Sequence, residues 1–127
     1  ENDKITGAAI KSNIGGIKMG FVKVADTSEL TSGSKKKIFV GDKVILLSNV
    51  DGSYYAISDK CPHMGGSLGE GILKDGIITC PKHGAKFDVR TGKAVGEAKM
   101  LLLKIKVNDN TVFPLKIEGN DIFVEID

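Results

Sequence analysis

The sequence is poor in cysteine and histidine, with two of each among 127 residues, and it has no tryptophan. Two cysteines exclude a scaffold held together by many disulfides, and a chain of this length forms one domain with a hydrophobic core of its own. No apolar run approaches about 18 residues, so the sequence predicts no membrane span. The formal net charge of +2 gives no support for a nucleic-acid partner.

The first residue bears on cellular location. The sequence begins with Glu1 rather than Met, and nothing in it resembles a signal peptide. We expect a cytoplasmic protein, with removal of an anchor or leader before Glu1 not excluded.

Short β-strands dominate the pattern from residue 21 onward, because brief apolar runs are bounded by Gly, Asp, Asn or Ser. The Gly41-Asp42 and Asp51-Gly52 pairs have the chemistry of hairpin turns. The sequence therefore predicts an all-β domain of small antiparallel strands with two long glycine-bearing loops. The expected strands are 21–25, 36–40, 43–48, 54–58, 76–79, 86–89, 100–107, 112–117 and 121–126.

Three local features refine this organisation. Residues 1–20 carry Gly15-Gly16 and are expected to form an N-terminal arm, which leaves 21–127 as the domain. Residues 26–30 indicate a helical turn with Asp26 as its cap. Pro114 inside an apolar run indicates an edge strand or a bulge.

All of the cysteine and histidine lies in one stretch, as C-P-H and then C-P-K-H. The candidate ligands are Cys61, His63, Cys80 and His83. Sixteen residues separate the two pairs, enough for a loop, a strand and a turn that bring them together. Thiol and imidazole ligands on tight loops suit a borderline-soft metal, and two such pairs make a four-ligand set.

Three interpretations of these four residues remain open at this point. They could be buried packing residues without a metal. A structural zinc site is a second possibility, although its usual signature places both cysteines in one loop and both histidines in another. Here each loop carries one of each, which favours a two-iron cluster of the kind in which two histidines replace two cysteines.

The segments C-P-H-M-G-G-S-L (61–68) and C-P-K-H-G-A-K-F-D-V-R-T-G (80–92) resemble the Rieske iron–sulfur family, and especially its small soluble ferredoxin-like members. The similarity runs from about residue 21 to residue 97. It implies an antiparallel β-sandwich or barrel with a cluster-binding subdomain at about 59–98. It also implies a [2Fe–2S] cluster, with Cys61 and Cys80 on the inner iron and His63 and His83 on the outer iron.

Departures from the family bear on the redox potential. High-potential members have two further cysteines, whereas this chain has none, and the positions of their Ser and Tyr hydroxyls correspond to Ala85 and Phe87. Fewer hydrogen bonds to the cluster predict a potential near the low end of the Rieske range, on the order of −150 mV. Residues 94–100 also lack the proline that usually belongs to the segment covering the cluster.

The resemblance implies a one-electron carrier that serves a reductase and a terminal oxidoreductase such as an oxygenase. An enzyme is not expected, because an oxygenase needs two more histidines and a carboxylate for a second iron. We expect a monomer that meets its redox partners transiently. Lys82 and Lys86, beside the expected outer ligands, are candidates for a basic docking rim that an acidic partner would meet.

The sequence leaves two alternatives to the carrier open. One is a redox subunit of a larger, membrane-anchored complex, which an apolar stretch of about 20 residues upstream would indicate. The other is a structural zinc module, which would be colourless and contain zinc instead of iron and sulfide.

Overall fold

A computed structural model describes residues 20–62, 65–82, 84–95, 98–100, 103–105 and 109–126. These residues form antiparallel strands and two short 3-10 turns, η1 (Thr27–Glu29) and η2 (Leu68–Glu70). The all-β fold expected from the sequence is therefore confirmed. The strands are β1 (Gly20–Asp26), β2 (Lys35–Val40), β3 (Lys43–Val50), β4 (Ser53–Ser58), β5 (Ile72–Lys74), β6 (Ile77–Thr79), β7 (Lys86–Asp88), β8 (Ala98–Met100), β9 (Leu103–Ile105), β10 (Val112–Phe113), β11 (Leu115–Glu118) and β12 (Asp121–Ile126).

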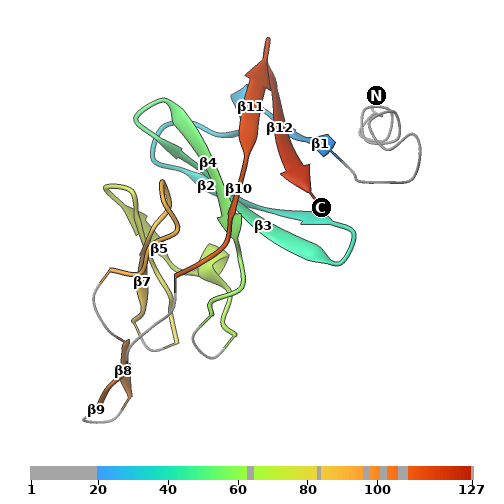
Figure 1. Ribbon diagram of the computed structural model, residues 1–127. Coiled ribbons are helices and arrows are strands. Elements are labelled where there is room, and N and C mark those ends of the chain that lie inside the picture. Colours follow the sequence, from blue (N-terminus) through green and yellow to red (C-terminus); the bar gives the residue numbers. More distant parts are fainter. Residues whose placement is uncertain are drawn as a thin grey trace.

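Two sheets make the body of the molecule (Figure 1). One has the strand order β1-β12-β11 and the other has the order β10-β4-β3-β2. The facing sides of the two sheets bury one apolar core. Its members include Val22, Ile45, Leu47, Ile122 and Val124, which are almost completely shielded from water.

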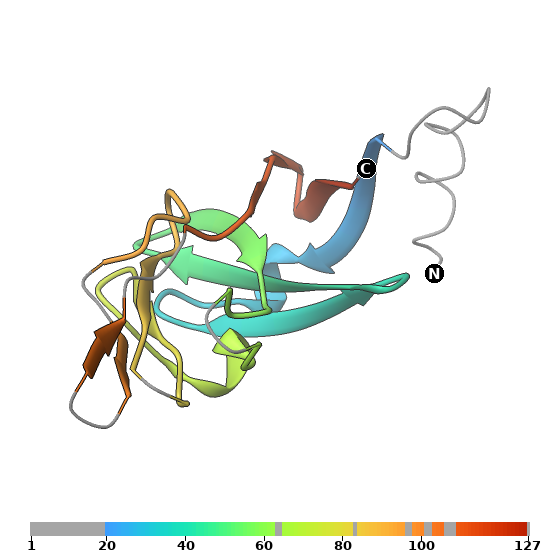
Figure 2. The same cartoon turned by 60° about the horizontal axis from the view of Figure 1, so that its bottom comes forward.

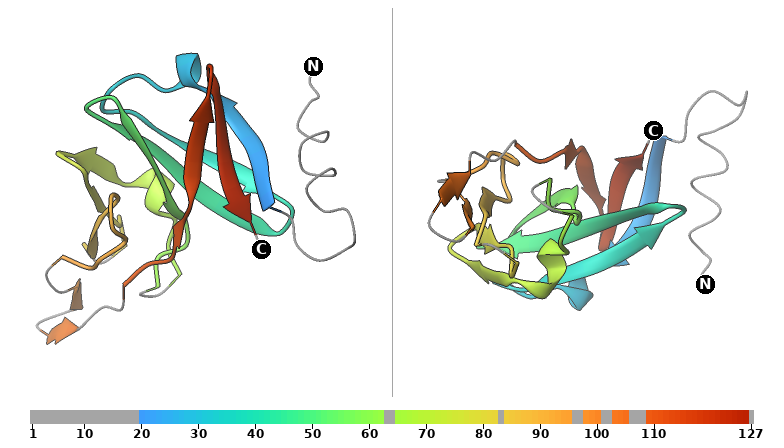
Figure 3. Two further views of the ribbon diagram at one scale, coloured as in Figure 1. Left: turned by 45° about the horizontal axis from the view of Figure 1, so that its top comes forward. Right: turned by 90° about the horizontal axis from the view of Figure 1, so that it is seen from below.

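A third sheet, β5-β6-β7, packs on the other side of the second body sheet and has a core of its own. Leu46 and Ile57 from β3 and β4 belong to this second core, although Ile45 and Leu47 belong to the first. The β3–β4 pair is thus buried on both faces, which explains its nearly continuous apolar run. Figures 2 and 3 show the third sheet at the end of the body away from the final strand, β12.

Turn chemistry places the strand connections where the sequence predicts them. The 41–42 and 51–52 pairs join β2 to β3 and β3 to β4, with Asp51 and Gly52 both at positive φ. Asp26 caps the first 3-10 turn, and its side chain accepts from the Ser28 N–H while Glu29 accepts from the Asp26 N–H. The capped turn expected at 26–30 is therefore confirmed.

The strand expected at 100–107 differs in the structure. β8 and β9 pair with each other in antiparallel register, so the chain reverses direction within this apolar run. A continuous apolar run gives no signal for such a reversal, because periodicity alone cannot place a turn inside it. The sequence does not predict β5, since its three residues between Gly71 and Asp75 are too few to show a period.

Pro114 lies between β10 and β11, which belong to different body sheets. Each of these strands lies at the edge of its sheet, as the missing proline N–H predicts. The expected N-terminal arm lies outside the described residues except for Gly20, which pairs with Ile126. Within the described part of the chain, no helix is long and apolar enough to cross a membrane.

Candidate metal centre

Two loops carry the cysteines, one after β4 and one after β6. Cys61 and Cys80 are both shielded from water, at 0% and 1% exposure, and both belong to the second core. His63 and His83 lie outside the described residues. The structure thus brings the two cysteines into one apolar environment, as the sequence predicts.

The two loops have the same hydrogen-bond pattern. The Cys61 N–H donates to the Gly66 carbonyl at 2.7 Å, and the Cys80 N–H donates to the Ala85 carbonyl at 2.7 Å. Four residues after each cysteine a glycine N–H donates back to the cysteine carbonyl, at 3.0 Å from Gly65 and 3.1 Å from Gly84. The doubled sequence motif is therefore a doubled backbone structure.

Glycine at the fourth position of each loop is explained by its backbone. Gly65 has φ of 71° and Gly84 has φ of 77°, in the left-handed region that residues with a side chain rarely adopt. This conformation returns the chain to the cysteine and closes the loop. Backbone hydrogen bonds within each loop therefore hold its two ends together.

The two loops touch each other at Gly66. A β carbon on this residue would lie 3.0 Å from the Cys80 Sγ and 3.2 Å from a side-chain carbon of Lys82. Only a bare backbone leaves ordinary contact distances at this point. The thiol of the second loop therefore lies against the backbone of the first, an arrangement that suits a metal group shared by the two loops.

Asp59, just before the first loop, forms hydrogen bonds with the residues that follow this loop. Its side chain, 5% exposed, accepts from the Ser67 hydroxyl at 2.7 Å and from the Gly69 N–H at 2.6 Å. Its carbonyl accepts from the Leu68 N–H at 2.8 Å, and its own N–H donates to the Val44 carbonyl. Asp59 thereby anchors the loop to the body sheet, a role that no motif in the sequence indicates.

Close backbone packing joins the two loops on the β5–β6 side. A β carbon on Gly71 would overlap the carbonyl oxygen of Thr79, the residue before Cys80. The Gly71 N–H donates to the Leu68 carbonyl, which ends η2. The start of β5 is thus pressed against the strand that leads into the second cysteine.

Ala85 and Phe87 are completely buried in the second core together with the cysteines. Neither side chain carries a hydroxyl or an amide. The Ala85 carbonyl is already used by the Cys80 N–H. These two positions therefore supply apolar contact and exclude water, as the sequence predicts.

A surface ion pair closes the turn after β7. Arg90 donates from Nε to Asp88 Oδ1 at 2.9 Å and from its terminal nitrogen to Oδ2 at 3.3 Å. The hydrogen bond from the Arg90 side chain holds the pKa of Asp88 below its ordinary value. The same pair raises the pKa of Arg90.

Comparison with known proteins places the chain in one family by sequence. A family profile described as Rieske [2Fe-2S] domain matches residues 20–122. The ferredoxin component of biphenyl 2,3-dioxygenase from Rhodococcus jostii (strain RHA1) is 34% identical over 109 residues, which is 86% of this chain and 95% of the relative.

Two solved structures agree with this description. The ferredoxin of carbazole 1,9a-dioxygenase from Nocardioides aromaticivorans IC177 has a TM-score of 0.74 at 27% identity, covering 85% of this chain and 99% of its own. A chain in the complex of reduced oxygenase and oxidized ferredoxin in carbazole 1,9a-dioxygenase has a TM-score of 0.71 at 28% identity. It covers 83% of this chain and 92% of its own.

Proposed function

This chain belongs to the Rieske [2Fe-2S] domain family, and we propose that it is a one-electron carrier that passes electrons from a reductase to a terminal oxygenase. The observation that carries the proposal is the pair of matched loops, each presenting one buried cysteine, which meet at Gly66. Relatives named as ferredoxin components, covered over nearly their whole length, support the same role.

The described residues fit a two-iron cluster. Cys61 and Cys80 supply two thiols in a dry environment, and the glycines of the loops leave room for the backbone to approach a bulky inorganic group. We assign one iron to these cysteines and the other to His63 and His83. The histidine assignment rests on the C-P-H and C-P-K-H spacing.

When bound, such a cluster takes up and releases a single electron. The residues of the chain hold it, keep water from its thiolate side and fix the relative position of the two loops. Two thiolates and two neutral imidazoles leave the oxidised state without net charge, whereas four thiolates would leave it at about −2. Uptake of an electron is easier from the neutral state, so the potential lies above that of an all-cysteine centre.

A low potential within the Rieske range is part of the proposal. Ala85 and Phe87 offer no hydroxyl to the centre, and the chain contains no cysteine beyond the two ligands. Fewer donors stabilise the reduced form less, which places the potential on the order of −150 mV.

The chain carries electrons and does not itself oxidise a substrate. Its only two histidines are both assigned to the cluster, so no imidazole is left for a mononuclear iron of the oxygenase type. We further propose a monomer with a cluster-binding subdomain at about 59–98. The separate core of the β5–β6–β7 sheet supports that division.

A redox titration tests the function most directly. The purified full chain should be coloured, contain iron and sulfide, and give a paramagnetic signal that appears with reduction on the order of −150 mV. A colourless protein with zinc would overturn the proposed function. A clearly positive potential would overturn only the assignment to the low-potential group.

A further inference from the structure

Three exposed lysines lie on the two cysteine loops and their borders. Lys60 precedes Cys61, Lys82 lies within the second loop, and Lys86 follows it on β7. In the sequence, segments 60–67 and 80–87 contain these three lysines and no Asp or Glu. We call these three residues the loop lysines.

The loop lysines converge on one part of the surface. The Lys60 Cε lies 3.7 Å from the position that a β carbon on Gly65 would occupy, and the Lys82 Cγ lies 3.2 Å from the corresponding position of Gly66. The aliphatic parts of the Lys60 and Lys82 side chains thus lie beside the neighbouring residues Gly65 and Gly66. Lys86 pairs with Thr79, next to Cys80, and so borders the same loops.

Several other basic side chains of the described residues are neutralised by a carboxylate, whereas Lys43, Lys74 and Lys93 are unpaired but are not gathered with other lysines at the cysteine loops. Among the ion pairs of the described residues, Lys23 lies 3.0 Å from Asp121 and Arg90 lies 2.9 Å from Asp88. No loop lysine takes part in an ion pair within the described part of the chain. The positive field at the loops is therefore uncompensated by neighbouring carboxylates of the described residues.

The patch has a limit on one side. Lys60 also borders an open groove of about 510 Å³ between β3, β4, β10 and β12. Farther along, this groove is lined by Asp42, Lys43 and Glu125, so its charge is mixed away from the loops. Toward this groove, the lysine-only surface of the described residues therefore ends near Lys60.

We propose that the loop lysines form the docking surface for an acidic face of the redox partner that exchanges the electron. This inference rests on the proposed function and names the charge of its partner. Complementary charge speeds the encounter of two proteins and orients them, while the contact itself stays small and transient. Docking at these lysines brings the partner within reach of the two loops.

Charged oxidants of opposite sign test the patch without knowledge of the natural partner. The reduced full chain is mixed with ferricyanide or with tris(phenanthroline)cobalt(III), each of which accepts one electron to become ferrocyanide or the cobalt(II) complex. At low ionic strength, the triple variant K60E/K82E/K86E should lose about tenfold in the ferricyanide rate and gain in the cobalt rate. Added salt should shrink both differences.

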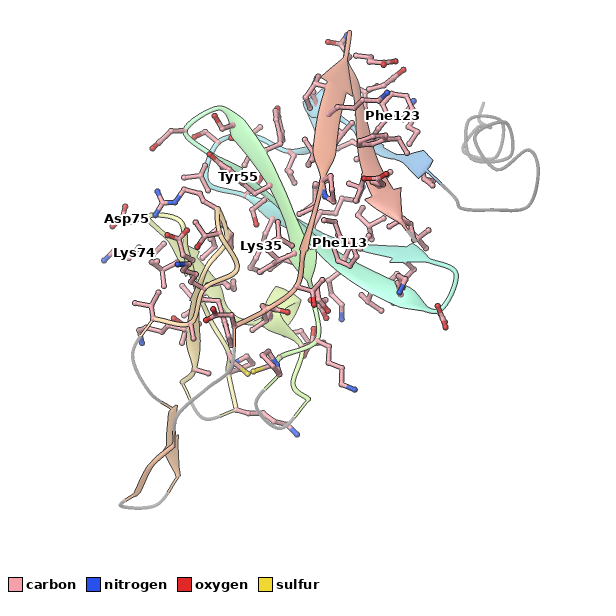
Figure 4. All side chains as sticks on the ribbon, viewed as in Figure 1. Lys35, Tyr55, Lys74, Asp75, Phe113 and Phe123 are labelled. Carbon is pink, nitrogen blue, oxygen red and sulfur yellow. The ribbon has the colours of Figure 1, made fainter. Side chains whose placement is uncertain are left out.

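Lys74→Glu is the control for each loop lysine changed singly, because Lys60→Glu, Lys82→Glu and Lys86→Glu alter the net charge by the same amount. Lys74 is exposed on the same subdomain, at the turn end of the β5–β6 hairpin, whereas Cys80 follows the other end of β6. Figure 4 labels Lys74 at this turn. This variant should leave both rates within about twofold. An effect of Lys74→Glu as large as that of Lys82→Glu alone, which changes the charge equally, would overturn the proposal. A change of both oxidant rates in the same direction would also overturn it, because that pattern reports an altered driving force instead of a local field.

A polyanion tests for docking of an acidic protein surface. Poly-L-glutamate should slow oxidation of the native chain by ferricyanide and leave the triple variant unaffected, whereas neutral dextran should slow neither. An unaffected native chain would overturn the proposal. Visible absorption of the protein is recorded before mixing. Absence of iron–sulfur absorption would overturn both the proposed function and the docking surface, whereas absorption with unaltered oxidation rates would overturn the docking surface alone.

Discussion

The Asp59 side chain accepts a 2.6 Å hydrogen bond from the backbone N–H of Gly69, across the whole of the first cysteine loop. Asp59→Ala should leave this partly buried N–H without its side-chain partner and lower the free energy of unfolding by about 2 kcal/mol. The first loop should also release its metal group sooner. The measurement is the urea midpoint of the purified chain together with the rate at which its visible absorption fades.

Asp59→Asn is the control for shape. The asparagine oxygen can still accept from the Gly69 N–H, and its amide can donate to the Ser67 hydroxyl, so the loss should stay below about 1 kcal/mol. If the alanine variant is as stable as the native chain, Asp59 does not anchor the loop.

Gly71 is the position at which the fold tolerates a side chain least. Its backbone φ of −92° is open to any residue, so the restriction comes from contact with the Thr79 carbonyl and not from backbone strain. Gly71→Ala should push β5 away from β6 and cost more than about 3 kcal/mol, or prevent folding. Soluble yield and thermal unfolding measure the effect.

Gly66→Ala is the companion substitution, because its nearest contacts are side-chain atoms at 3.0 to 3.3 Å that can shift by a few tenths of an ångström. This variant should fold and change the visible spectrum, since the displaced atom is the Cys80 Sγ. Equal stability of the two alanine variants would contradict this account.

The strands and the cysteine loops were predictable because their signals are local. β12 (Asp121–Ile126) coincides with its expected range, since apolar alternation there is bounded by turn residues on the N-terminal side. The spacing of Cys61 and Cys80 predicted that they come together, because tight loops flanked by Pro and Gly have few alternatives.

The features that sequence could not supply depend on tertiary contact. Asp59 looks like an ordinary polar residue at the end of a strand until the chain ten residues later folds back on it. Gly71 is one glycine among several nearby, and only the approach of β6 distinguishes it. The reversal between β8 and β9 is hidden by an apolar run without a turn signal.

The Asp88–Arg90 pair predicts a pH dependence of stability. The pKa of Asp88 lies below its ordinary value of 3.8 in the folded chain, chiefly because the Arg90 side chain donates to it. A carboxyl with a depressed folded-state pKa contributes stability above the unfolded-state pKa, and this contribution is lost as the pH falls through the folded-state pKa. Arg90→Met should therefore be less stable than the native chain at pH 7, with a difference that shrinks below about pH 4.

Urea midpoints at a series of pH values measure this difference. Lys93→Met removes an exposed cation from the same turn and should give a difference independent of pH in the same acid range. A gap between Arg90→Met and the native chain that persists at pH 2 would exclude the ion pair as its cause.

Hydroxyl groups at positions 85 and 87 should raise the redox potential. Ala85→Ser and Phe87→Tyr place donors in the buried region that contains both cysteine side chains. Donors directed at the sulfurs stabilise the reduced state, so the double variant should titrate at a more positive potential than the native chain. If no sulfur acceptor is present, the buried hydroxyls should instead cost about 1 to 3 kcal/mol each and leave the potential unchanged.

His83→Cys tests the histidine assignment, which rests on spacing alone. A thiolate in place of a neutral imidazole adds one negative charge to the centre, so reduction becomes harder and the potential should become more negative. The centre should be retained, because a thiolate also binds iron. Lys82→Cys puts a thiol one residue away in the same loop and should leave the titration close to that of the native chain. A redox potential unchanged by His83→Cys would remove His83 from the ligand set. An equal lowering of the potential by Lys82→Cys would do the same, and another residue would then have to bind the second iron.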